Sequence, residues 1–170
     1  MSPSHVHLPI YEIFDEFRLR VRQQNRLLIS APTGSGKSTQ VPQWLLDLVP
    51  DGKRILVLQP RRLAARMLAE RVAWERQEKP SGCVGFQTRY ESACSRDTRI
   101  LFITEGILAR MLVSSPNLPD IGAIVFDEFH ERSLHADLGL AMACHCQQAR
   151  RPDLRLIVMS ATMDAVGLQN

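Results

Sequence analysis

Residues 31–38 read Ala31-Pro32-Thr33-Gly34-Ser35-Gly36-Lys37-Ser38 and stand between a short apolar run and a helix-forming run. Apart from Ala31 in place of the opening glycine, the stretch fits the P-loop pattern. Gly34 and Gly36 can adopt backbone angles that other residues disfavour, so that amide N–H groups converge on phosphate oxygens. The following helix directs its positive N-terminal end at the same anion. A glycine-rich connector without function is the alternative, and the strand and helix on either side argue against it.

Working outward from this loop, the chain alternates apolar and helix-forming segments. The apolar segments predict strands at 27–30, 55–58, 83–87, 100–103, 123–126 and 154–159. Helices are predicted between them, at 10–26, 39–48, 60–76, 105–113 and 136–150. Continuous apolar strands joined by helices indicate a mostly parallel sheet with helices on both faces. We therefore predict a single α/β domain.

The composition places the chain among globular proteins. Of its 170 residues 45% are hydrophobic and 23% are charged, with a net charge of +3. No apolar run reaches the ~18 residues of a membrane span, and residues 1–9 lack the features of a signal peptide. The cysteines form no disulfide framework, and Cys144-His145-Cys146 has no second cluster at zinc-ligand spacing. We expect a soluble, cytoplasmic protein without a membrane partner.

Two segments, 90 residues apart, predict an ATPase. In the loop, Lys37 is expected to reach the β- and γ-phosphates, and the Ser38 hydroxyl to join the Mg²⁺ shell. Asp127 comes directly after the apolar strand 123–126, where a P-loop ATPase carries its second Mg²⁺ anchor. Glu128 beside it can polarise the attacking water. A kinase does not need such a residue, and a GTPase needs base-reading motifs such as Asn-Lys-x-Asp, which are absent.

Further motifs resemble those of DEAH-box helicases of superfamily 2. Asp127-Glu128-Phe129-His130 stands at their second motif, with Phe129 replacing alanine, and Ser160-Ala161-Thr162 matches the third. Residues 59–65, Gln-Pro-Arg-Arg-Leu-Ala-Ala, match motif Ia, and residues 104–108, Thr-Glu-Gly-Ile-Leu, match motif Ib. Residues 84–91 resemble the family's Gly-Tyr-x-x-Arg-Phe segment. Residues 127–138 are especially similar to the bacterial HrpB-type branch.

This resemblance implies a RecA-like P-loop NTPase fold and an ATP-dependent RNA helicase. It covers nearly the whole chain, and nothing matches the later Gln-x-x-Gly-Arg-x-Gly-Arg motif or the C-terminal regions of such helicases. Residues 1–170 are therefore expected to be the first RecA-like domain of a longer protein. The implied partners are RNA, contacted through its backbone, and a second RecA-like domain in the same chain. The implied ligands are ATP and Mg²⁺.

The resemblance also assigns roles to single residues. The residues implied to hold the triphosphate are Thr33, Gly34, Ser35, Gly36, Lys37, Ser38 and Thr39. Those implied for Mg²⁺ are Ser38 and Asp127, and those for catalysis are Lys37, Asp127, Glu128 as general base and His130. Ser160 and Thr162, with His130, would couple nucleotide state to the second domain. Arg71 would stack on adenine. The implied RNA contacts are Arg61, Arg62, Arg89 and Thr104.

For several of these residues a structural alternative stays open. Arg71 fits a solvated helix charge as well as an adenine contact, and Ser160 and Thr162 fit a strand-end turn. Between Lys53 and Arg76 there are seven basic residues against two glutamates. This excess favours binding of backbone phosphate, although a charged helix face is the usual explanation.

Three functions remain possible at this point. The first is the ATPase part of an RNA helicase, and the second is a stand-alone P-loop phosphotransferase. The third is a nucleotide- or RNA-binding module without turnover. The second needs a lid or acceptor-binding segment for which the chain has no spare residues.

Overall fold

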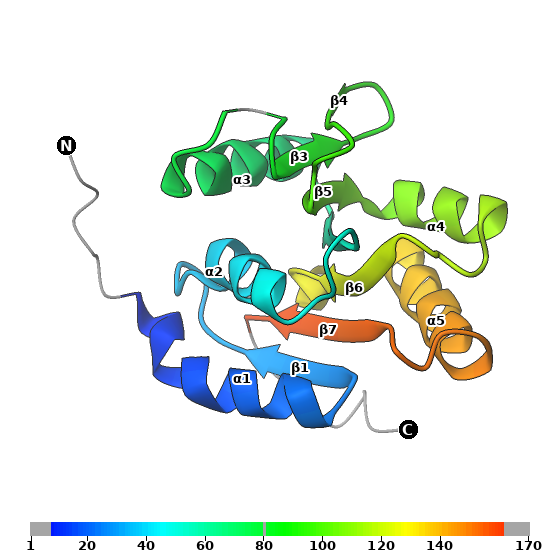
Figure 1. Ribbon diagram of the computed structural model, residues 1–170, viewed down its shortest axis with the longest axis horizontal. Helices are drawn as coiled ribbons and strands as arrows, with labels where there is room; N and C mark the ends of the chain where they lie inside the picture. The colour runs from blue at the N-terminus through cyan, green and yellow to red at the C-terminus, as the bar shows by residue number, and fades with distance from the viewer. Residues whose placement is uncertain (1–7, 80, 162–170) are drawn as a thin grey trace.

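In the computed structural model, residues 8–79 and 81–161 are described, and their strands form one twisted sheet (Figure 1). The strands of the sheet are β1 (Arg26–Ser30), β2 (Arg54–Gln59), β3 (Val84–Gln87), β4 (Ser92–Ala93), β5 (Ile100–Thr104), β6 (Ile121–Phe126) and β7 (Arg155–Ser160). Their order across the sheet is β1-β7-β6-β2-β5-β3-β4. Every pairing is parallel except that of the short edge strand β4 with β3. This confirms the predicted, mostly parallel α/β fold.

Helices cover both faces of the sheet, as the apolar strands require. The α-helices are α1 (Phe14–Gln23), α2 (Lys37–Trp44), α3 (Arg62–Glu75), α4 (Glu105–Ser114) and α5 (Leu134–Ala149). Short 3₁₀ turns add η1 (Pro9–Ile13), η2 (Leu45–Asp47) and η3 (Phe129–Glu131).

Alternate residues along β2, β5, β6 and β7 point into two separate cores. On one face, residues such as Val57 and Phe102 pack with α1, α2 and α3. On the other face their neighbours Leu58 and Ile103 pack with α4 and α5. Successive side chains of a strand point to opposite faces, so a strand buried on both sides has no polar position. The central strand β6 is buried at all its residues, as its apolar sequence predicts.

The structure corrects several predicted boundaries. The helix predicted over 10–26 is a 3₁₀ turn followed by α1, and it ends at Gln23 because Gln24 is already extended. The helix predicted from Pro60 starts at Arg62, since Arg61 is still extended as the chain leaves β2. The edge strand β4 was not predicted, because Ser92 and Ala93 carry no apolar pattern.

The parallel topology brings the predicted motifs to one edge of the sheet. Strands β1, β7, β6 and β2 are neighbours, and the loop 31–38, Ser160, Asp127 and Gln59 lie at or directly after their carboxyl ends. Ligands of open α/β sheets bind at this edge. Within the residues described, no helix is long and apolar enough to cross a membrane.

Candidate nucleotide site

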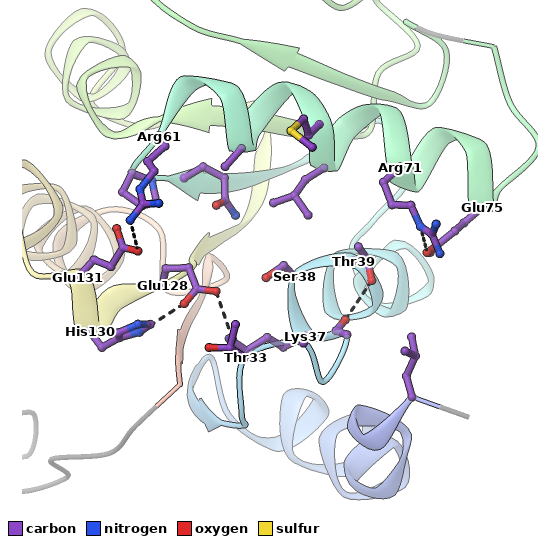
Figure 2. Close-up of a pocket in the computed structure, with 18 residues that line it drawn as sticks. Thr33, Lys37, Ser38, Thr39, Arg61, Arg71, Glu75, Glu128, His130 and Glu131 are labelled. Atoms are coloured by element: carbon purple, nitrogen blue, oxygen red, sulfur yellow. Dashed lines mark hydrogen bonds and ion pairs between the residues drawn. The ribbon is translucent and has the colours of Figure 1, made fainter. Parts of the chain in front are cut away.

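A cleft of about 730 Å³ lies at this edge, between the loop 31–38 and helix α3. Figure 2 shows the residues that line it, with α3 on one side and the start of α2 on the other. Of the residues predicted to bind nucleotide, Thr33, Gly34, Gly36, Lys37, Ser38, Thr39 and Arg71 line the cleft. Glu128 and His130 line it as well. The structure thus brings together residues that are up to 97 positions apart, from Thr33 to His130.

The loop 31–38 has the backbone of a phosphate cradle. Gly34 and Gly36 have φ angles of +80° and +95°, in the left-handed region that favours glycine. Helix α2 begins at Lys37, immediately after Gly36, and the first amide N–H groups of a helix lack partners inside it. The Ser35 hydroxyl is buried and, among the described residues, has no hydrogen-bond partner. This loop fits a polyphosphate.

Lys37 is the most unusual charge of the domain, because its side chain is only 1% exposed. Its Nζ lies 3.2 Å from Oε1 of Glu128. A buried ammonium needs such a counter-charge, since the interior does not solvate it. The residue expected to hold phosphate is thus paired with the predicted general base. A phosphate group in the cleft offers Lys37 a second anion and leaves Glu128 free for another partner.

Asp127 is buried at the end of β6 and held by hydrogen bonds. Gln59 Nε2 donates to Oδ2 at 2.6 Å, and the Glu128 amide donates to Oδ1 at 2.9 Å. Burial raises the pKa of the Asp127 carboxyl, while hydrogen bonds from Ser38 and Gln59 lower it. An interior carboxylate beside a serine hydroxyl is a fitting ligand pair for Mg²⁺, which takes few protein oxygens and keeps several waters. Among the described residues, no group of three or more His, Cys, Asp or Glu side chains is arranged so that it could hold a metal ion by itself.

His130 connects the acidic motif with the end of β7. The Ala161 amide donates to His130 Nδ1 at 3.3 Å, and Oε2 of Glu128 lies 3.4 Å from the same nitrogen. A change in the position of Glu128 can therefore alter the hydrogen bond between His130 and the Ala161 amide. Ser160 is buried at the last position of β7, paired in register with Ser30 of β1. Thr162 lies outside the described residues.

The remaining predicted contacts divide into two groups. Arg61 lines the nucleotide cleft and pairs with Glu131 at 2.9 Å. Arg62 and Arg89 lie instead beside the exposed ring of Tyr90, with guanidinium carbons 5.0 and 5.5 Å from its centroid. Thr104 ends β5 and precedes α4. The four residues predicted to contact RNA therefore do not form one cluster: Arg62 and Arg89 share Tyr90, whereas Arg61 lies in the nucleotide cleft.

Several cleft residues were not predicted from the sequence. Gln59 was matched only as the first residue of motif Ia, with no role in the site, and the structure shows that it donates a hydrogen bond to Asp127 from the carboxyl end of β2. The N-terminal residues were also missed: Leu8 lines the cleft, and the Ile10 amide donates to the Ser35 carbonyl at 3.1 Å. Glu75 lines the end of the cleft away from His130, and Gln40 donates a hydrogen bond to its carboxylate. Their side chains carried no signal, because their partners are distant in sequence.

Comparison with known proteins adds a family and relatives. The family model described as "DEAD/DEAH box helicase" matches residues 13–169. The chain is 44% identical over 162 residues to the ATP-dependent RNA helicase HrpB of Escherichia coli strain K12, covering 95% of this chain and 20% of that protein. It is 41% identical to the probable ATP-dependent RNA helicase DHR2 of Saccharomyces cerevisiae, covering 93% of this chain and 22% of that protein.

Solved structures resemble the fold closely. A crystal structure of the E. coli DExH-box NTPase HrpB superposes with a TM-score of 0.89 at 42% identity, covering 95% of this chain and 20% of that one. A crystal structure of the E. coli DEAH/RHA helicase HrpB superposes with a TM-score of 0.87 at 43% identity, covering 92% of this chain and 20% of that one. The RecA-like fold expected from the motifs is confirmed. The chain spans about a fifth of these relatives' length.

The geometry of Lys37 predicts the effect of its removal. Lys37→Ala should weaken binding of Mg-ATP and Mg-ADP by several kcal/mol, because a charged donor to phosphate is lost. Lys79→Ala, which removes an exposed lysine away from the cleft, is the matched control. Calorimetric titration of both variants measures the effect. Equal affinities in wild type and Lys37→Ala would refute the assignment.

The burial of Asp127 predicts a conflict between stability and function. Because burial disfavours its charged form, Asp127→Asn should raise the midpoint of thermal unfolding at neutral pH while removing Mg²⁺-dependent nucleotide affinity. Unfolding curves and titrations with and without Mg²⁺ measure both effects. A lower midpoint together with undiminished Mg²⁺ dependence would contradict this reading.

Proposed function

Because this chain belongs to the DEAD/DEAH box helicase family, we propose that it is the ATP-binding, first RecA-like domain of an ATP-dependent RNA helicase. The observation that carries the proposal is the buried Lys37 paired with Glu128 beside Asp127, at the mouth of a phosphate-binding loop. The full-length protein would couple ATP hydrolysis to movement along, or unwinding of, RNA. A protein of the relatives' length has room for the second RecA-like domain that this coupling needs.

In the proposed reaction, the loop amides and the α2 N-terminus hold the polyphosphate of ATP. Lys37 moves its hydrogen bond from Glu128 to the phosphate, and Glu128 accepts a proton from the attacking water. The water oxygen bonds to the γ-phosphorus as the bond to the bridging oxygen breaks, and ADP leaves with that oxygen. Mg²⁺, held by Ser38 and Asp127, would neutralise charge on the phosphate oxygens. Gln59 would fix the orientation of the Asp127 carboxylate through its hydrogen bond to Oδ2.

Coupling would run through His130. Its Nδ1 lies within reach of both Glu128 and the Ala161 amide. A new partner for Glu128 therefore changes the contacts of the segment that contains Ser160 and Thr162. In the longer protein we expect this segment to transmit nucleotide state to the second domain.

RNA binding is proposed for the surface around the exposed ring of Tyr90, which follows β3. Of the seven basic residues between 53 and 76, four are paired with glutamates, namely Arg61, Arg66, Arg71 and Arg76. Arg62 and Arg89 instead flank the exposed Tyr90 ring, which suits contact with a nucleic-acid strand. Arg61, which lines the nucleotide cleft, and Thr104, at the end of β5, are proposed as separate contacts. Such contacts are electrostatic and should weaken as salt rises.

One observation favours the second candidate, a nucleotide-binding module without turnover when the domain stands alone. The two arginines that line the cleft, Arg61 and Arg71, are paired with Glu131 and Glu75. Because both are engaged by these carboxylates, neither is positioned in advance as an arginine finger for the γ-phosphate. Since a finger contributes about 10³–10⁵ in rate, the domain alone should bind nucleotide far better than it hydrolyses it.

The general base is tested in a protein that includes the second domain. Glu128→Gln should retain ATP binding and abolish hydrolysis, because the amide cannot accept the proton of water. Glu131→Gln, which changes another cleft glutamate, is the control and should retain turnover. Phosphate release measures both. Turnover of Glu128→Gln within about threefold of wild type would mean that another residue is the base.

The 170-residue chain alone should bind Mg-ADP, hydrolyse ATP very slowly and unwind no duplex. Its affinity for single-stranded RNA should be weak and should fall at moderate salt. Steady-state ATPase assays with and without single-stranded RNA decide the matter. Robust RNA-stimulated turnover would require an arginine finger from within the chain or from a second copy, and would overturn this proposal.

A further inference from the structure

The end of the cleft away from His130 and Glu131 is formed by Arg71 and Glu75 (Figure 2). The two residues lie one turn apart on α3, and in the figure the Arg71 guanidinium points toward the Glu75 carboxylate. Arg71 is the residue proposed to stack on the nucleobase. Glu75 lies outside every motif that the sequence matches.

Arg71 is held on two sides. Its Nε donates to Oε1 of Glu75 at 2.8 Å, and its guanidinium carbon lies 4.8 Å from the ring centroid of Trp74. The guanidinium is planar, so one edge is fixed by the carboxylate and one face by the indole. The side chain nevertheless stays 58% exposed. The second face of the guanidinium is therefore open to a planar ligand.

Glu75 is in turn fixed by the helix that follows the phosphate loop. Its Oε2 accepts hydrogen bonds from Gln40 Nε2 and Gln43 Nε2, each at 2.9 Å. Gln40 is also fixed, because its Oε1 accepts a hydrogen bond from the Tyr11 hydroxyl at 2.8 Å. The four side chains Tyr11, Gln40, Gln43 and Glu75 connect η1, α2 and α3. Both carboxylate oxygens of Glu75 are thus engaged, one by Arg71 and one by α2.

A second pair on the same helix shows what this network adds. Arg66 and Glu70 have the same four-residue spacing and a similar distance of 2.9 Å. Glu70 is 54% exposed, however, whereas Glu75 is only 17% exposed. The outer pair is an ordinary surface ion pair, which contributes little. The Arg71–Glu75 pair is instead hydrogen-bonded to α2, the helix that follows the loop 31–38.

We propose that Glu75 is a positioning residue for the nucleobase: it holds the Arg71 guanidinium in place relative to the phosphate loop, through Gln40 and Gln43. This inference rests on the proposed nucleotide site and deepens it. An unrestrained arginine loses rotamer freedom when a ligand orders it, and that loss weakens binding. Here the ordering is completed on folding. Since α2 begins at Lys37, the base platform and the phosphate cradle keep a constant separation.

The experiment separates base binding from phosphate binding. The affinities of Mg-ADP and Mg-pyrophosphate are measured by titration for wild type, Arg71→Ala, Glu75→Gln and the double variant. Glu75→Gln replaces one carboxylate oxygen by an NH₂ group, which can only donate, with almost no change of shape. The variant therefore cannot accept from Arg71 and from Gln40 and Gln43 at the same time. Glu70→Gln is the matched control on the same helix.

Glu75→Gln should weaken Mg-ADP about fivefold and leave Mg-pyrophosphate unchanged, as a loss of preorganisation predicts. Arg71→Ala should show the same selectivity, and adding Glu75→Gln to it should cost nothing more, because the two residues act as one unit. Glu70→Gln should change neither affinity. A purely structural role for Glu75 would instead weaken both ligands together.

The outcomes distinguish this inference from the function on which it rests. If Arg71→Ala selectively weakens Mg-ADP and Glu75→Gln does not, the nucleotide site stands and the role of Glu75 is wrong. If wild type binds neither ligand, or Arg71→Ala changes nothing, the proposed base platform itself fails. Should Glu75→Gln unfold the chain, Tyr11→Phe removes only the exposed phenol hydroxyl from the same network. It should produce a smaller loss for Mg-ADP alone, and no loss would overturn the proposal.

Discussion

The burial of two opposite charges at one edge of the sheet is the constraint on which the site depends. Lys37 and Asp127 are 1% and 5% exposed, and an isolated buried charge costs far more than a domain's stability margin. Each is tolerated only because a partner is in place: Glu128 for the ammonium, and Gln59 and Ser38 for the carboxylate. A fold that satisfies these groups must assemble the site at the same time. The site is therefore preformed, and a ligand exchanges partners rather than creating the arrangement.

The order of the strands explains how residues from only a few loops form one site. Reading across β1, β7, β6, β2 and β5, the carboxyl ends carry the phosphate loop, Ser160, Asp127, Gln59 and Thr104 in turn. Residues that are remote in sequence become neighbours because parallel strands end at the same edge. Strands β7, β6, β2 and β5 contribute buried residues to both cores, whereas β1 contributes to the core under α1 and α2 alone. Polar groups at that edge inherit rigidity from an apolar interior.

The features that could be predicted from the sequence are those formed by residues close together in the chain. The loop 31–38, the strand before Asp127 and the parallel sheet were all recognisable, because each is encoded by adjacent residues or a simple period. The Lys37–Glu128 pair and the Gln59 hydrogen bond were not, since they join residues 91 and 68 positions apart. Arg62 illustrates the same limit. Its motif was recognised from the sequence. Its position over Tyr90, rather than in the nucleotide cleft, depends on the direction in which α3 starts after the extended residue Arg61.

Helix α2 unites these contacts. Its first residue carries the buried ammonium, and its next two turns carry the amides of Gln40 and Gln43 that reach Glu75 on α3. The same helix packs Val41 and Trp44 into the core, where Phe14, Phe17 and Tyr11 surround the indole. A helix so anchored cannot shift at one end alone, because its core side would lose close packing. Movement of the phosphate loop must therefore move the far end of the cleft as well, and the polar network transmits that movement to Arg71.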